Sequence, residues 1–135
     1  MTHADVQDWL DRYIRAWETY DRADIEALFS ADATYRYQPW GDPVTGRNAI
    51  IDDWIAPGGK PEQADGAGTF AAHYEPYAVD PDGRAVAVGW TTYWKDATRT
   101  EVVRAYHNAY LLEFDADGRC RAFTEFFMET PKRLW

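Results

Sequence analysis

The sequence predicts one α+β domain over residues 1–135, in which helices come first and a curved antiparallel sheet follows. Apolar residues recur at spacings of three and four in the first part of the chain, which is typical of amphipathic helices. From Phe70 onward the period changes to two, which is typical of strands. A length of 135 residues fits a single domain, and 46% hydrophobic residues are enough to bury a core.

The first helix is predicted to follow Thr2, because Asp5 stands three residues later and completes a variant of the capping box. Charged side chains fill one face of this helix. Its other face is an apolar stripe made of Val6, Trp9, Leu10, Tyr13, Ile14, Trp17 and Tyr20. Asp21 can cap a short second helix, whose buried stripe is predicted to be Ile25, Leu28 and Phe29.

A short strand is predicted over residues 33–38, with Tyr35 and Tyr37 on one face. Two prolines and a glycine in the segment 39–43 end this strand. A third helix is predicted after Gly46, with its end at the Pro-Gly-Gly sequence 57–59. Its apolar side consists of Ile50, Ile51, Trp54 and Ile55. Residues 57–68 are rich in Gly, Pro and Ala and predict a loop.

The sheet is predicted to contain strands at 70–79, 84–95, 100–114 and 119–130. Asp-Pro-Asp-Gly and Asp-Ala-Asp-Gly are turn sequences between strands, and residues 96–99 make the middle turn. Fifteen residues are long for one strand, so the third of these is expected to bend or carry a bulge. The two strand faces differ in bulk, and Trp90, Asn108 and Tyr110 are predicted on the large, aromatic face.

Composition limits the partners that this chain can have. Aromatic residues make up 16% of it, which indicates either a lined cavity or a dense aromatic core. A net charge of −9 disfavours nucleic acid and anionic membranes as partners. The single cysteine, Cys120, allows no intramolecular disulfide. No signal-peptide pattern and no membrane-length apolar stretch is present, so we expect a cytoplasmic protein that does not bind membranes.

Several short motifs occur in a characteristic order: Arg-Tyr-Ile at 12–14, Asp-Ile-Glu-Ala-Leu at 24–28, Ala-Asp-Ala-Thr at 31–34, Gly-Arg at 46–47 and the hairpin 114–119. This order resembles the nuclear-transport-factor-2-like (NTF2-like) superfamily, which includes SnoaL-like cyclases and ketosteroid isomerases. The resemblance implies a cone-shaped fold, in which a mixed sheet wraps around three N-terminal helices and encloses a pocket. It also implies a homodimer formed through the sheet. Because the superfamily holds many activities, the site must decide the function.

The resemblance to the ketosteroid isomerases suggests two hydrogen-bond donors. Their oxyanion hole uses a tyrosine in a similar Arg-Tyr-Ile context, which implies this role for Tyr13; the alternative is that Tyr13 only belongs to the apolar stripe. Their second donor, an aspartate, corresponds to Tyr110. The position of their base corresponds to Gln38 or Tyr37, and neither is a competent base at neutral pH. Steroid isomerisation by that mechanism is therefore not expected.

Glu125 is the candidate acid/base residue. It shares one face of the last strand with Phe123 and Phe127, and the resemblance places this face toward the cavity. A carboxyl group between aromatic rings is desolvated, which raises its pKa toward the range that proton transfer needs. The alternatives are an ion pair with Arg104 or Arg121, or a position in solvent beyond the cavity rim.

Further side chains are expected to bind the ligand. Arg104 could hold a substrate carboxylate or neutralise Glu125, and Asn108 could orient a substrate oxygen. His107 has the opposite parity and points away on a regular strand, although a bulge could turn it inward. The cavity wall is expected to contain Trp17, Tyr35, Tyr37, Trp40, Trp54, Trp90, Phe123 and Phe127; for each of them a place in a plain hydrophobic core is the alternative.

No metal-ligand cluster, phosphate-binding loop, or activated serine or cysteine is recognisable, so we expect neither a metal nor a cofactor. The expected partner is a small organic molecule. As an enzyme, the protein would be a cofactor-free isomerase, dehydratase or cyclase acting on a small apolar cyclic or aromatic carbonyl compound. The alternatives are a non-catalytic ligand-binding protein and a dimeric interaction protein of the same fold.

Overall fold

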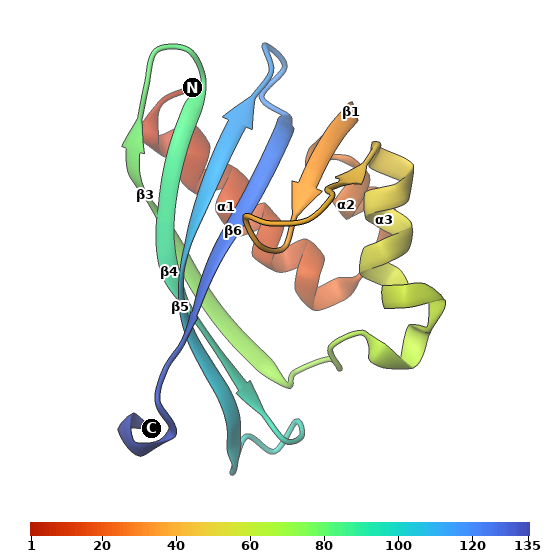
Figure 1. Cartoon of the computed structure of the whole chain (residues 1–135), viewed down its shortest axis with the longest axis vertical. Coiled ribbons are helices and arrows are strands. Elements are labelled where there is room, and N and C mark those ends of the chain that lie inside the picture. Colours follow the sequence, from red (N-terminus) through yellow and green to blue (C-terminus); the bar gives the residue numbers. More distant parts are fainter.

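The computed structural model describes residues 1–135 and shows three α-helices against one face of a curved sheet (Figure 1). The helices are α1 (His3–Thr19), α2 (Arg22–Glu26) and α3 (Arg47–Ile55). The strands are β1 (Phe29–Arg36), β2 (Val44–Thr45), β3 (Phe70–Val79), β4 (Arg84–Trp94), β5 (Val102–Phe114) and β6 (Cys120–Glu129). Short 3-10 turns occur at η1 (Pro57–Gly59), η2 (Pro61–Gln63) and η3 (Lys132–Leu134).

The sheet is mixed and open, with the strand order β2-β1-β6-β5-β4-β3. β1 and β6 are parallel neighbours, whereas every other pair of neighbouring strands is antiparallel. Helix α1 packs along β3 and α3 packs along β1, so the helices lie within the curve of the sheet (Figure 1). This is the cone-shaped α+β fold that the sequence predicted.

Helix α1 begins with the predicted capping box. The Thr2 hydroxyl accepts a hydrogen bond from the Asp5 backbone N–H at 3.1 Å, and the Asp5 carboxylate accepts one from the Thr2 N–H at 2.8 Å. The helix is capped at its C-terminus by Tyr20, which adopts the left-handed conformation with φ of 52°. Its buried side is Val6, Trp9, Leu10, Tyr13 and Ala16. No helix of the chain is both long enough and apolar enough to cross a membrane.

β1 begins at Phe29, four residues before the predicted start of this strand. Residues 28 and 29 were predicted to continue the short second helix, but α2 already ends at Glu26. Leu28 and Phe29 are fully buried as predicted, although not as parts of a helix. The Leu28 carbonyl accepts a hydrogen bond of 2.8 Å from the Cys120 N–H, and Phe29 pairs with Cys120. Pairing with a distant strand therefore overrides the local helical pattern.

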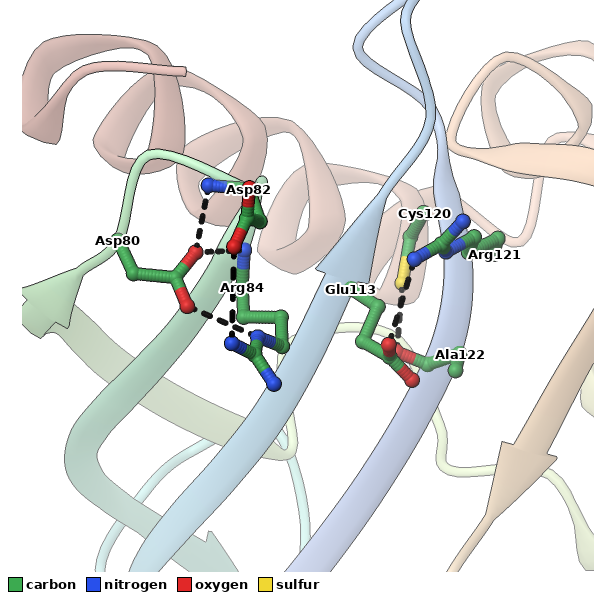
Figure 2. A network of polar contacts seen from close by, with 7 residues as sticks. All are labelled: Asp80, Asp82, Arg84, Glu113, Cys120, Arg121 and Ala122. Atoms are coloured by element: carbon green, nitrogen blue, oxygen red, sulfur yellow. Dashed lines mark hydrogen bonds and ion pairs between the residues drawn. The ribbon is translucent and has the colours of Figure 1, made fainter.

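An aspartate forms the same hydrogen bonds in two of the predicted turns, and Figure 2 shows the first of these turns, at Asp80. The Asp80 carboxylate accepts hydrogen bonds of 2.9 Å from the backbone N–H groups of Asp82 and Arg84, and pairs with the Arg84 guanidinium at 2.8 Å. Asp115 repeats the backbone pattern toward residues 117 and 119. An aspartate that bonds the backbone two residues later is a typical turn former, so these two side chains set the β3–β4 and β5–β6 hairpins.

β5 carries the bulge that its length predicted. Tyr93 pairs with Arg104 but Trp94 pairs with Val102, so Val103 is the extra residue. A second irregularity lies near Phe114, and residues 104–112 between the two are regular. The even-numbered residues of this stretch therefore face the helices. His107 has the opposite parity and lines a hollow on the outer face of the sheet.

β4 turns the face that contains Gly89 and Tyr93, and not the face that contains Trp90, toward the helices. In the register of the β4–β5 pair, Gly89 lies opposite Asn108 and Trp90 lies opposite His107. Residues directly opposite each other share a face. Trp90 is therefore on the outer face, 39% exposed, and the expectation that it shares a face with Asn108 is wrong. The Tyr74 ring fills the space beside Gly89, since a Cβ there would lie 2.6 Å from Tyr74 Cδ1.

Candidate functional site

A cavity lies between the sheet, the C-terminal half of α1, α3 and the loop that follows α3. It consists of two adjoining hollows of about 170 Å³ and about 240 Å³. The residues that line both hollows are Trp17, Tyr37, Tyr93 and Glu125. The inner hollow continues to Tyr13, Tyr35, Trp54 and Tyr110, and the outer hollow to Gln38, Arg104, Asn108 and Phe127.

Two tyrosine hydroxyls meet at the wall of the inner hollow. Tyr13 from α1 and Tyr35 from β1 are almost fully buried, and their hydroxyl oxygens are 2.7 Å apart. Burial raises the pKa of both phenols well above the usual value, so both keep their protons at neutral pH. In a pair of hydroxyls only one proton lies between the oxygens. The second proton is free to donate to an acceptor in the cavity.

Glu125 lies where the two hollows meet. Its carboxylate accepts a hydrogen bond of 3.2 Å from the Asn108 side-chain amide. Desolvation by burial raises the pKa of Glu125 to about 7. Neither arginine named as an alternative partner forms an ion pair with it, since Arg104 lies 4.0 Å from Asp65 and Arg121 lies 3.4 Å from Glu113. This carboxyl can therefore accept or donate a proton near neutral pH.

Two more carboxyl groups line the inner hollow, and neither was predicted from the sequence. Asp53 on α3 accepts a 2.5 Å hydrogen bond from the Tyr37 hydroxyl. Asp65 in the loop accepts a 3.1 Å bond from the Trp17 indole N–H, and its backbone N–H donates to the Tyr20 hydroxyl at 3.0 Å. A loop carries no periodic pattern, so no sequence signal pointed to Asp65. Asp53 is half-buried and follows the exposed Asp52, and in the sequence this pair of aspartates resembles a solvated helix face.

Tyr110 from β5 lines the inner hollow and is 1% exposed. Its ring stacks on Tyr74, with 4.4 Å between the ring centroids, and meets Tyr13 edge-on at 5.8 Å. Burial raises the pKa of Tyr110 well above its usual value. The two tyrosines that the sequence singled out as donors thus lie side by side at one cavity wall.

Arg104 is the cationic residue that lines the outer hollow. Its guanidinium lies over the Tyr93 ring, 4.2 Å from the ring centroid, which is a favourable cation–π geometry. Its side chain is 47% exposed, and its contact with Asp65 at 4.0 Å is longer than a hydrogen bond. The outer hollow therefore offers a ligand a cation as well as the amides of Gln38 and Asn108.

The remaining expected wall residues do not all lie at the cavity. Trp54 and Trp17 line the inner hollow, and the buried Trp54 indole N–H has no hydrogen-bond partner. Phe123 lies beneath Tyr35, with its ring parallel and the centroids 4.3 Å apart, and does not line the cavity. Phe127 lines the outer hollow and Trp40 meets its ring edge-on, but Trp40 is 65% exposed. Trp90 lies on the outer face of the sheet.

Two further kinds of site, a metal site and a reactive thiol, can be compared with the structure. No three or more His, Cys, Asp or Glu side chains are grouped as metal ligands would be. Cys120 is fully buried, and its thiol donates to the Ala122 carbonyl oxygen at 3.3 Å (Figure 2). Burial raises the pKa of this thiol to about 12, so it stays protonated and unreactive at neutral pH.

Comparison with known proteins connects this geometry to a family. A family model described as a SnoaL-like domain matches residues 2–119. Among solved structures, the chain is similar to a protein of unknown function with a cystatin-like fold from Methylobium petroleophilum PM1, with a TM-score of 0.62 and 17% sequence identity. The alignment covers 98% of this chain and 80% of that chain, and at this identity it shows the fold alone. No curated protein matches the sequence.

Proposed function

Since the chain belongs to the family of SnoaL-like domains, which generally bind small molecules, we propose that it transfers a proton within a small cyclic or aromatic carbonyl compound without a cofactor. One observation carries this proposal. A single cavity contains a desolvated carboxyl, Glu125, and a hydroxyl pair, Tyr13 and Tyr35, that has one proton to donate. These are a general acid/base and an oxyanion donor, the two groups that enolisation requires.

The proposed reaction begins when the carbonyl oxygen of the substrate accepts the free proton of the hydroxyl pair as a hydrogen bond. Glu125 then removes a proton from the carbon beside that carbonyl. The negative charge that develops on the oxygen is stabilised by the hydroxyl, while Tyr110 completes the wall behind it. Glu125 finally returns the proton to another carbon, which is an isomerisation, or to a departing hydroxyl, which is a dehydration. In both cases the carboxylate ends as it began.

The lining of the cavity supports a ligand that contains a ring. Aromatic side chains dominate the inner hollow, and the two hollows together have the size of a site for a small organic molecule. The indole N–H of Trp54 and the amides of the outer hollow would serve polar substituents. Arg104 would form an ion pair or a hydrogen bond with an anionic or strongly polar substituent.

The test is exchange of hydrogen for deuterium at the carbon beside the carbonyl. A panel of cyclic and aromatic ketones is incubated with the protein in D2O and followed by proton NMR. The wild type should catalyse exchange on at least one compound, and Glu125→Gln should lose about 10²- to 10⁴-fold of that rate. Glu129→Gln, an exposed change on the same strand, is the matched control and should retain full activity. Equal rates in wild type and Glu125→Gln would remove Glu125 from the mechanism.

A non-catalytic binding protein would use the same cavity, and the exchange experiment separates it from an enzyme. A compound that binds saturably, measured by quenching of tryptophan fluorescence, yet exchanges no faster than in buffer would establish binding without catalysis. Trp17 and Trp54 line the inner hollow, so their emission reports its occupancy.

We also propose that two copies of the chain associate through the outer face of the sheet. Four apolar side chains of this face, from three neighbouring strands, are 39% to 72% exposed: Trp90, Leu111, Phe126 and Met128. An exposed row of large apolar side chains is typical of an interface between proteins. A second copy of the same face, packed sheet to sheet, would cover this row.

A further inference from the structure

The side chain of Asn108 uses its hydrogen-bonding capacity in three directions. Its Oδ1 accepts a bond of 3.2 Å from the Met128 backbone N–H. Its Nδ2 donates to the Tyr74 hydroxyl at 2.9 Å and to Glu125 Oε1 at 3.2 Å. Because a backbone N–H can only donate, the amide oxygen must face Met128 and the amide nitrogen must face Glu125. The orientation of this amide is therefore fixed by its surroundings.

The Tyr74 hydroxyl, which is one of the partners of Asn108, is hydrogen-bonded to one more side chain. It accepts from Asn108 and shares a second hydrogen bond of 2.8 Å with the Thr91 hydroxyl, in which either oxygen can be the donor. Asn108 is 9% exposed and Thr91 is 1% exposed, so water competes little with this chain of bonds. Each of the two amide protons of Asn108 has its own acceptor, and the amide cannot turn without leaving buried groups unpaired.

The register of the sheet explains why this amide reaches Glu125. Asn108 pairs with Phe127 and Tyr110 pairs with Glu125 across the β5–β6 ladder. Asn108 and Glu125 are therefore diagonal neighbours on the inner face, which is within reach of a long side chain. The opposite neighbour of Asn108 on β4 is Gly89, which leaves room for the Tyr74 ring beside it.

We propose that Asn108 is a positioning residue, whose amide holds Oε1 of Glu125 and so leaves Oε2 as the oxygen that exchanges a proton with the ligand. This inference rests on the proposed function of Glu125. The hydrogen bond to Oε1 stabilises the carboxylate and opposes desolvation, which stabilises the carboxylic acid. Asn108 thereby fixes which oxygen of the carboxyl group faces the cavity.

Other charged and titratable groups surround Glu125 from every neighbouring element. Those that line the same hollows are Asp53 on α3, Asp65 in the loop, Arg104 on β5, and the phenols of Tyr13, Tyr20, Tyr35, Tyr37, Tyr93, Tyr106 and Tyr110. Among the side chains of this chain, the one that donates a hydrogen bond to Glu125 is Asn108. Replacement of Asn108 should therefore change the titration of Glu125 directly.

The experiment is a pH titration of the ligand-free protein with glutamate labelled by 13C at the side-chain carboxyl. The Glu125 signal is identified by its absence in Glu125→Gln. In Asn108→Asp, a donor becomes a carboxyl that repels the charged form, so the midpoint of Glu125 should rise by more than one pH unit. In Asn108→Ala it should rise by about one unit, the shift that corresponds to one lost hydrogen bond to a charged group. Thr124→Val, on the opposite face of β6, is the matched control and should leave the midpoint unchanged.

Unchanged midpoints in Asn108→Asp and Asn108→Ala, with native near-ultraviolet circular dichroism, would overturn the inference. If Asn108→Asp does not fold, Asn108→Ala decides alone, since it introduces no new charge. The titration needs no substrate, so its result stands even if no compound shows proton exchange. Conversely, exchange that depends on Glu125 but not on Asn108 would refute the positioning role and leave the proposed function intact.

Discussion

The hydroxyl oxygens of Tyr13 and Tyr35 lie 2.7 Å apart, although the two residues come from a helix and a strand 22 positions apart in the sequence. Either oxygen can act as the donor within the pair. Either hydroxyl can therefore donate the one hydrogen bond that the pair offers to a ligand in the cavity. If one hydroxyl is removed, the other is still free to donate.

The first prediction concerns this redundancy. Tyr13→Phe and Tyr35→Phe should each lower the exchange rate by about tenfold or less, because one donor remains. The double variant should lose more than the product of the two single losses, up to about 10²- to 10³-fold, the effect of removing an oxyanion donor. The rates kcat and kcat/KM of the four proteins form a double-mutant cycle. A shared role would be contradicted if the loss of rate in the double variant were no larger than the product of the losses in the two single variants.

The second prediction concerns stability and pH. The pKa of Glu125 is raised from 4.5 to about 7 on folding, so between these values the folded state binds more protons than the unfolded state. Stability due to this group is present below about pH 4.5 and is lost as the pH rises toward 7. Glu125→Gln should therefore be more stable than wild type at pH 8, by up to about 3 kcal/mol, and the difference should shrink toward pH 5.

Urea unfolding of wild type and Glu125→Gln at pH 5, 6, 7 and 8 measures this difference. Other groups with shifted pKa values, such as Asp65, are common to both proteins and cancel in the comparison. A constant difference across this range would mean that Glu125 is not desolvated.

The third prediction concerns the close approach of β3 to β4. A Cβ at position 89 would lie 1.9 Å from the His73 carbonyl oxygen and 2.6 Å from a Tyr74 ring carbon. Gly89→Ala should therefore cost about 3 kcal/mol or more, since backbone and a buried ring must both move. Gly66→Ala, whose Cβ would meet only the flexible Thr69 side chain at 3.3 Å, is the control and should cost about 1 kcal/mol or less. Equal midpoints in urea for both variants would show that the strands are further apart.

The fourth prediction concerns the proposed dimer. Leu111 lies on the outer face of β5 and is 46% exposed. A carboxylate at this position would be buried without a partner in a sheet-to-sheet dimer, so Leu111→Asp should give a monomer with little change in monomer stability. Arg15→Asp, an exposed change on α1, should leave the assembly unaffected. Light scattering coupled to gel filtration reads the mass, and a monomeric wild type would refute the proposal.

Much of the fold follows from the sequence alone. The first helix, its capping box and the four long strands were predicted because their signals are local: a 3.6-residue or two-residue period and an aspartate at each turn. The start of β1 was missed, because Leu28 and Phe29 fit a helical stripe and only their pairing near Cys120 selects the strand. Trp90 was placed on the wrong face. The alternation along a strand divides its residues between two faces, but it does not determine which of these faces the helices cover.

The site was predictable where the family resemblance or strand parity applied. Glu125, Tyr13 and Tyr110 line one hollow, and Asn108 lies beside Glu125. The partnership of Tyr13 with Tyr35 depends on how a helix crosses a strand, which no spacing in the sequence encodes. Asp65 lies in a loop and joins the site through a hydrogen bond with Trp17, so its place there could not be predicted from the sequence either.

The most direct test of the account is the pH dependence of substrate hydrogen exchange between pH 5 and 9. If Glu125 is the base, the exchange rate of the wild type should rise with pH and level off with a midpoint near 7, the pKa of this carboxyl. Glu125→Gln should show a low rate without that midpoint. The same midpoint in Glu125→Gln, or a wild-type rate that does not change between pH 5 and 9, would contradict the central claim that Glu125 moves the proton.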